Sequence, residues 1–94
     1  GNSVDVEIMG HDFNTTTNLA HTIAEQARKI PGAEDIKISR DEDKSELQIV
    51  LDQDKLARHG LSTADVGSYL RNRIYGYRNS KFKEDGEEYY RSSG

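Results

Sequence analysis

The sequence predicts a small α+β domain, because strand-length and helix-length apolar patterns follow one another along its 94 residues. Apolar side chains take alternate positions in several short segments, which is the pattern of half-buried strands. They recur every three or four residues in two longer segments, which is the pattern of amphipathic helices. The order is strand, helix, strand, strand, helix and strand. This order is typical of the ferredoxin-like βαββαβ two-layer sandwich, and we expect it here with a C-terminal β-hairpin.

The first strand and the first helix are predicted in the N-terminal third of the chain. The strand is indicated by alternating apolar residues before Gly10, namely Val4, Val6 and Ile8. Asp12 or Asn14 is a suitable N-cap for a helix that starts near Thr15. Its apolar stripe comprises Leu19, Ile23, Ala27 and Ile30. Pro31-Gly32 ends this helix, because proline cannot continue the hydrogen-bond ladder and disfavours helix in the residue before it.

Two further strands follow, joined by a charged segment. Apolar residues at alternate positions indicate them: Ile36 and Ile38 in the second strand, and Leu47, Ile49 and Leu51 in the third. We expect residues 40–45 between them to form a solvated hairpin loop. The acidic residues of this loop lack the glycine and the distal glutamate of an EF-hand, so we do not predict a calcium site.

A short helix and a longer helix are predicted after the third strand. Residues 53–58 favour a helix, which Gly60 ends because glycine adopts the left-handed conformation without steric cost. Ser62 is a suitable N-cap for the next helix, with the carboxylate of Asp65 near the helix N-terminus. The apolar stripe of this helix is Val66, Leu70 and Ile74. A stripe of this kind needs a partner surface, so we expect it to be buried.

The C-terminal part is predicted as a β-hairpin. Residues 77–82 and 87–90 are its expected strands, with a turn at residues 84–86, and residues 91–94 are expected to be a frayed end. Five tyrosines occur late in the chain: Tyr69, Tyr75, Tyr77, Tyr89 and Tyr90. We expect them to pack the helix against the hairpin. Contact with a partner is the alternative, whereas stacking on RNA bases is disfavoured by the acidic composition.

Two motifs resemble the resistance, nodulation and division (RND) efflux transporters. Residues 51–66, LDQDKLARHGLSTADV, are similar to the family pattern V-D-x-x-K-A-x-x-L-G-L-S-x-x-D-V. The matching residues are Asp52, Lys55, Gly60, Leu61, Ser62, Asp65 and Val66. Ile30, Pro31 and Gly32 resemble the family's I-P-G-V-x-x-V step. These pieces occur in the family's order and extend over residues 4–89.

The resemblance implies one domain, 1–94, with a porter-like part at 4–61 and the start of a docking-like part at 62–90. Lys81-Phe82 and Asp85-Gly86 make the chain more similar to the family's second large periplasmic loop than to its first. Such a segment is the soluble periplasmic portion of an inner-membrane, proton-driven multidrug exporter. Its implied partners are other subdomains of the transporter, trimeric protomers, a periplasmic adaptor, an outer-membrane channel and apolar or amphiphilic small molecules.

The resemblance also suggests Ile38 and Arg40 as substrate-binding residues, since the family's substrate pocket includes residues near the end of this strand. A free-standing ferredoxin-like binding or regulatory module is the alternative function, because this fold supports many functions. We expect the excised segment to leave strand edges unpaired, which favours an edge-paired or swapped dimer.

Composition excludes several classes of function. The net charge of −4 disfavours a nucleic-acid groove, because phosphate binding needs a basic surface. The chain has no cysteine, so it can form neither a disulfide nor a thiolate metal site. No nucleophile with a base, paired carboxylates or cofactor motif stands out, and we predict no enzymatic activity, no catalytic residue and no cofactor.

Histidine and methionine give no indication of a metal site. The spacing of His11, His21 and His59 fits no zinc pattern. Met9 is the sole methionine, whereas a copper or silver exporter is expected to cluster thioethers. We therefore predict no metal ligands and do not expect a heavy-metal pump. No apolar run reaches the 18 or so residues that cross a bilayer.

Overall fold

The computed structural model describes residues 2–10, 12–41, 43–85 and 91–93. In chain order the elements are β1 (Ser3–Met9), α1 (Phe13–Arg28), β2 (Ala33–Asp41), β3 (Lys44–Leu51), α2 (Gln53–Arg58), α3 (Thr63–Asp85) and β4 (Arg91–Ser93). Within the described ranges, no helix combines the length and the apolar character needed to cross a bilayer.

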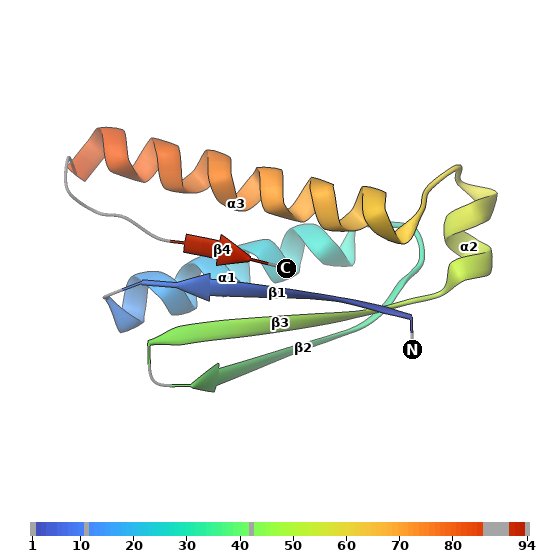
Figure 1. Ribbon diagram of the computed structural model, residues 1–94, viewed down its shortest axis with the longest axis horizontal. Coiled ribbons are helices and arrows are strands. Elements are labelled where there is room, and N and C mark those ends of the chain that lie inside the picture. Colours follow the sequence, from blue (N-terminus) through green and yellow to red (C-terminus); the bar gives the residue numbers. More distant parts are fainter. Residues whose placement is uncertain (1, 11, 42, 86–90, 94) are drawn as a thin grey trace.

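The four strands form one sheet in the order β2-β3-β1-β4, and all neighbours are antiparallel. Helix α1 packs on β2 and β3, whereas α3 packs on β1 and β4 and also contacts α1. Figure 1 shows α3 running alongside the sheet for most of the length of the molecule. This order of strands and helices is the ferredoxin-like arrangement, so the predicted fold class is confirmed.

The hydrophobic core lies between the helices and one face of the sheet. Strand register brings the apolar residues of adjacent strands together, as in the cross-strand pairs Val6↔Leu47 and Ile38↔Leu47. The predicted stripe of α3 closes this core, because Val66, Leu70 and Ile74 are at most 2% exposed. The core thus runs without a break across residue 62, where the docking-like part was expected to begin.

The predicted C-terminal hairpin is wrong over its first strand, because α3 continues through residues 77–82 to Asp85. Gly76 does not stop the helix, since an interior glycine costs only about 1 kcal/mol relative to alanine and the buried stripe anchors the turns before it. The predicted strand at 87–90 lies outside the described residues. Arg91–Ser93, expected to be frayed, instead forms β4 and pairs with β1, with Ser93 opposite Glu7.

The predicted hairpin loop at residues 40–45 is also too long. Strand β2 extends to Asp41 and β3 begins at Lys44, and these two residues face each other across the ladder. Helix α1 begins at Phe13, two residues earlier than expected, and Asp12 is its N-cap, because its carboxylate accepts a 3.0 Å hydrogen bond from the amide of Asn14.

Most side chains on the face of the sheet away from the helices are polar. Glu7 on β1 lies directly opposite Glu46 on β3, an unfavourable pairing of like charges. The ammonium group of Lys44 lies 3.3 Å from a carboxylate oxygen of Glu46 and 3.4 Å from one of Glu7. These contacts raise the pKa of Lys44 above its ordinary value, and the hydrogen bond to Glu46 has a larger effect than the one to Glu7. Lys44 therefore offsets the repulsion between the two glutamates.

Candidate functional site

The two family-like motifs meet at one end of the molecule. The amide of Asp52 donates a 2.8 Å hydrogen bond to the carbonyl oxygen of Gly32, which joins the turn before β2 to the start of α2. Gly32 has a φ of +102°, which disfavours any other residue. A Cβ atom at this position would lie 2.9 Å from the side chain of Leu56 and 3.2 Å from the carbonyl oxygen of Asp52. Glycine therefore lets the two segments approach this closely.

Helix α2 is closed at both ends by residues of the second motif. Asp52 is its N-cap, and its carboxylate accepts a 3.1 Å hydrogen bond from the amide of Lys55. At the other end Gly60, with a φ of +71°, donates to the carbonyl of Ala57, and Leu61 donates to that of Leu56 at 2.9 Å. This pair of bonds is a Schellman motif. The half-buried side chain of Leu61 packs against the core as a result.

Helix α3 starts with a reciprocal capping box. The hydroxyl of Ser62 accepts a 3.2 Å hydrogen bond from the amide of Asp65, whose carboxylate accepts a 2.9 Å bond from the amide of Ser62. The side-chain amide of Gln53 donates a 2.7 Å bond to the hydroxyl of Thr63, which ties the start of α2 to the start of α3. The motif residues therefore set the path of the chain between β3 and α3.

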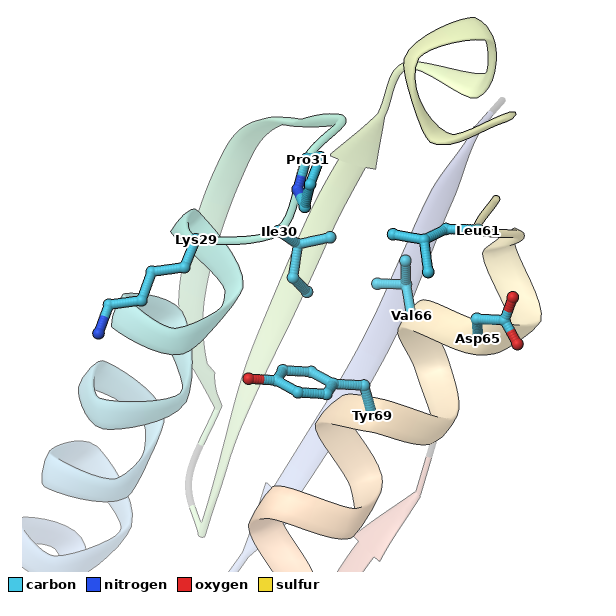
Figure 2. Close-up of a pocket in the computed structure, with 7 residues that line it drawn as sticks. All are labelled: Lys29, Ile30, Pro31, Leu61, Asp65, Val66 and Tyr69. Carbon is cyan, nitrogen blue, oxygen red and sulfur yellow. The ribbon is translucent and has the colours of Figure 1, made fainter. Parts of the chain in front are cut away.

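An apolar pocket of about 280 Å³ lies beside this junction, between the end of α1 and the start of α3. Its lining residues are Lys29, Ile30, Pro31, Leu61, Asp65, Val66 and Tyr69. Figure 2 shows apolar side chains from both sides pointing into the pocket, with the ring of Tyr69 reaching from α3 toward α1. The charged ends of Lys29 and Asp65 point away from its centre. Motif residues from two distant segments thus share one apolar pocket.

The predicted substrate-binding residues lie elsewhere, on the helix-covered face of β2. The guanidinium carbon of Arg40 lies 3.5 Å from the centre of the Phe13 ring. Its Nη1 atom donates hydrogen bonds to the hydroxyls of Thr17 and Ser45. Ile38 is half-buried and packs against the core. Both residues therefore contribute to the packing of β2 on α1, and their role in substrate binding stays a prediction.

Sequence patterns did not indicate the contributions of Lys29 and Tyr69 to the pocket. Tyr69 was expected to pack against a hairpin, but it is 37% exposed, and Tyr75 and Tyr77 are 67% and 50% exposed. The expectation that these three tyrosines are packing residues is therefore wrong, while Tyr89 and Tyr90 lie outside the described residues. One available signal was the four-residue spacing from Asp65 to Tyr69, which places both on one side of α3.

Comparison with known proteins identifies the family. A sequence model of the AcrB/AcrD/AcrF family matches residues 1–90. The chain belongs to this family. It is thus a segment of an RND transporter, and the resemblance carried by the two motifs is confirmed.

Three proteins illustrate its relatives. Each is 33% identical to this RND segment over 63 residues, which are 67% of the chain and 6% of the relative. They are protein HelA of Legionella pneumophila, the cobalt-zinc-cadmium resistance protein CzcA of Cupriavidus metallidurans and the cation efflux system protein CzcA of an Alcaligenes species. Among the residues that the structure describes, no three His, Cys, Asp or Glu side chains gather as metal ligands.

Proposed function

We propose that this chain is a periplasmic porter segment of an inner-membrane, proton-driven RND efflux transporter. The family match over residues 1–90 carries the proposal. The structure supports it through the joint between Gly32 and Asp52, which links the two motifs that the family pattern contains. Because the chain spans 6% of the length of its relatives, most of the transporter lies outside it.

The proposed role is to guide substrate and to contact other parts of the assembly, without catalysis. The contacts we expect are with other subdomains, the trimeric protomers, a periplasmic adaptor and an outer-membrane channel. The continuous core of α1, α3 and the sheet suits this role, since packed elements move together when a domain shifts. Residues 62–90 are proposed to lead into a docking part, and the second large periplasmic loop is the proposed location.

Apolar or amphiphilic compounds are the proposed cargo, as in a multidrug exporter. Metal cations are the second candidate, because one relative is named for resistance to cobalt, zinc and cadmium and another for cation efflux. The encoding gene allows a direct test. A strain without the full-length gene should become more sensitive to dyes and lipophilic cations, and the gene should restore resistance only while a proton gradient is present. Sensitivity to cobalt, zinc and cadmium alone would favour the second candidate.

The reading frame tests the alternative of a free-standing ferredoxin-like module. The transporter proposal requires a frame that continues on both sides into hydrophobic spans of about 20 residues. A frame closed by natural start and stop codons around the segment would contradict it.

A further inference from the structure

Exposed side chains continue the pocket along α3. Tyr69, Arg73 and Tyr77 recur every four residues, so they lie on one side of the helix, next to the buried stripe. We call them the Tyr–Arg stripe. Tyr69 belongs to both the pocket and the stripe, and the guanidinium carbon of Arg73 lies 4.9 Å from the centre of its ring. From Tyr69 to Tyr77 the stripe extends about 12 Å at 1.5 Å per residue.

This surface has a local positive charge on a chain whose net charge is −4. Lys29 at the pocket and Arg73 in the stripe are both exposed, and neither is paired with a carboxylate within the described part of the chain. The nearby carboxylate of Asp65 already accepts the amide of Ser62 in the capping box. A bound group with its own carboxylate could therefore pair with Lys29 or Arg73.

We propose that the pocket and the Tyr–Arg stripe form a docking surface for a protein segment that presents one apolar side chain and, one helical turn away, a carboxylate. The apolar side chain would enter the pocket, against Ile30, Leu61 and Val66. An acidic residue one helical turn away would pair with Arg73. Tyrosine and arginine are enriched at protein interfaces, and residues that anchor a complex are most often aromatic or arginine.

Two observations favour a protein segment over a free small molecule. The pocket volume of about 280 Å³ is just below the range of about 300–1,000 Å³ that is usual for small-molecule sites. The stripe also leads away from the pocket along α3, where a compact ligand held by the pocket would not reach Tyr77. The matched residues make up only 6% of the length of the relatives, so a longer transporter would have other segments that could occupy this surface. The proposal concerns an interface and does not depend on which substrate is exported.

The test is an amide NMR titration of the chain with short helical peptides as probes. The first peptide carries one tryptophan and, a turn later, one glutamate. In the second peptide glutamine replaces the glutamate, and in the third serine replaces the tryptophan. We expect saturable shifts at Lys29, Val66, Tyr69 and Arg73 with the first peptide, and at least about tenfold weaker binding of each of the other two.

Variants of the chain complete the test. Arg73→Glu should abolish the preference for the acidic peptide, and Tyr69→Ser should weaken its binding about tenfold or more. Tyr75→Ser is the matched control, because Tyr75 is an exposed tyrosine on a different side of α3, and it should bind the peptide like the unchanged chain. Circular dichroism checks that each variant is folded.

Three results would overturn the proposal. They are shifts that do not saturate, equal affinity for the glutamate and glutamine peptides, and shifts that cluster away from the pocket. A further titration uses indole-3-propionate, a small molecule that combines an apolar ring with a carboxylate. If it binds as tightly as the first peptide and at the same residues, the surface recognises small organic anions instead of a protein segment.

Discussion

The carbonyl oxygen of Gly32 accepts a 2.8 Å hydrogen bond from the amide of Asp52, and the α-carbon of Gly32 faces Leu56 so closely that a Cβ atom would be 2.9 Å from it. This contact joins residues 20 positions apart in the sequence. It sets the distance between the turn after α1 and the start of α2, and so positions the chain that continues into α3.

Gly32→Ala should destabilise the chain by about 2 kcal/mol or more. The left-handed backbone costs a residue with a side chain about 1–2 kcal/mol, and the crowding against Leu56 adds an overpacking cost of about 1–3 kcal/mol. Urea unfolding measures the change. Gly60→Ala is the control, because the φ of Gly60 is also positive but nothing lies within 4 Å of the added Cβ atom. It should therefore lose only the stability that the left-handed backbone costs, about 1–2 kcal/mol. If both substitutions lower the free energy of unfolding by the same amount, the contact between an added Cβ atom and Leu56 does not destabilise the chain.

Leu70→Ala should lower the free energy of unfolding by about 2–5 kcal/mol, because Leu70 is completely buried beneath α3. A thermal melt should show a clear drop in Tm. Tyr75→Ala, on the exposed side of the same helix, should change stability by no more than about 0.5 kcal/mol. A loss at Leu70 no larger than that at Tyr75 would mean that α3 does not pack on the sheet in solution.

Lys44→Met should destabilise the chain at neutral pH, since it leaves Glu7 and Glu46 facing each other uncompensated. The raised pKa of Lys44 means that its stabilising effect is present below the ordinary lysine value of 10.5 and is lost as the pH rises through the higher folded-state value. The difference in urea midpoint between the two proteins should therefore be constant near neutral pH and shrink in strong alkali. Added salt should reduce it as well. If the difference in urea midpoint persists unchanged in alkali, the substitution acts through the packing of the side chain at position 44 and not through its charge.

The chain by itself should bind drug-sized compounds no more tightly than roughly 1 mM, or about −4 kcal/mol. Its pocket of about 280 Å³ cannot enclose most of such a molecule, and sites of that kind usually form between domains. Titration with dyes and lipophilic cations, followed by amide NMR shifts, measures the affinity. Saturable micromolar binding at one site would contradict this prediction.

The parts of the fold that depend on neighbouring residues could be predicted from the sequence. The stripe of α3, the cap at Asp12, the box at Ser62 and the left-handed Gly60 are each encoded within a few positions, and all are present. The path after Gly76 could not be predicted in this way. Tyr77 and Phe82 are the only aromatic or aliphatic side chains between Gly76 and Asp85, too few to show a helix or a strand period, so the outcome depends on the packing of earlier turns against the sheet.

The candidate site illustrates the same limit. Its motif residues were identified, but the pocket arises only when the end of α1 meets the start of α3, a contact between segments more than 30 residues apart. The stacking of Arg40 on Phe13 depends likewise on how α1 lies across β2. Neither contact leaves a periodic pattern in the sequence.

The pairing of the last strand with the first has a consequence for how this unit fits into a longer polypeptide. Because β4 is antiparallel to β1 and Ser93 faces Glu7, a chain that continued along the same line would travel back toward Ser3. At about 3.4 Å per residue, four more residues would bring it level with that end of β1. Entry and exit would then be neighbours at the same end of two adjacent strands. The unit could thus be inserted into, or removed from, a larger protein at a single point without pulling its strands apart.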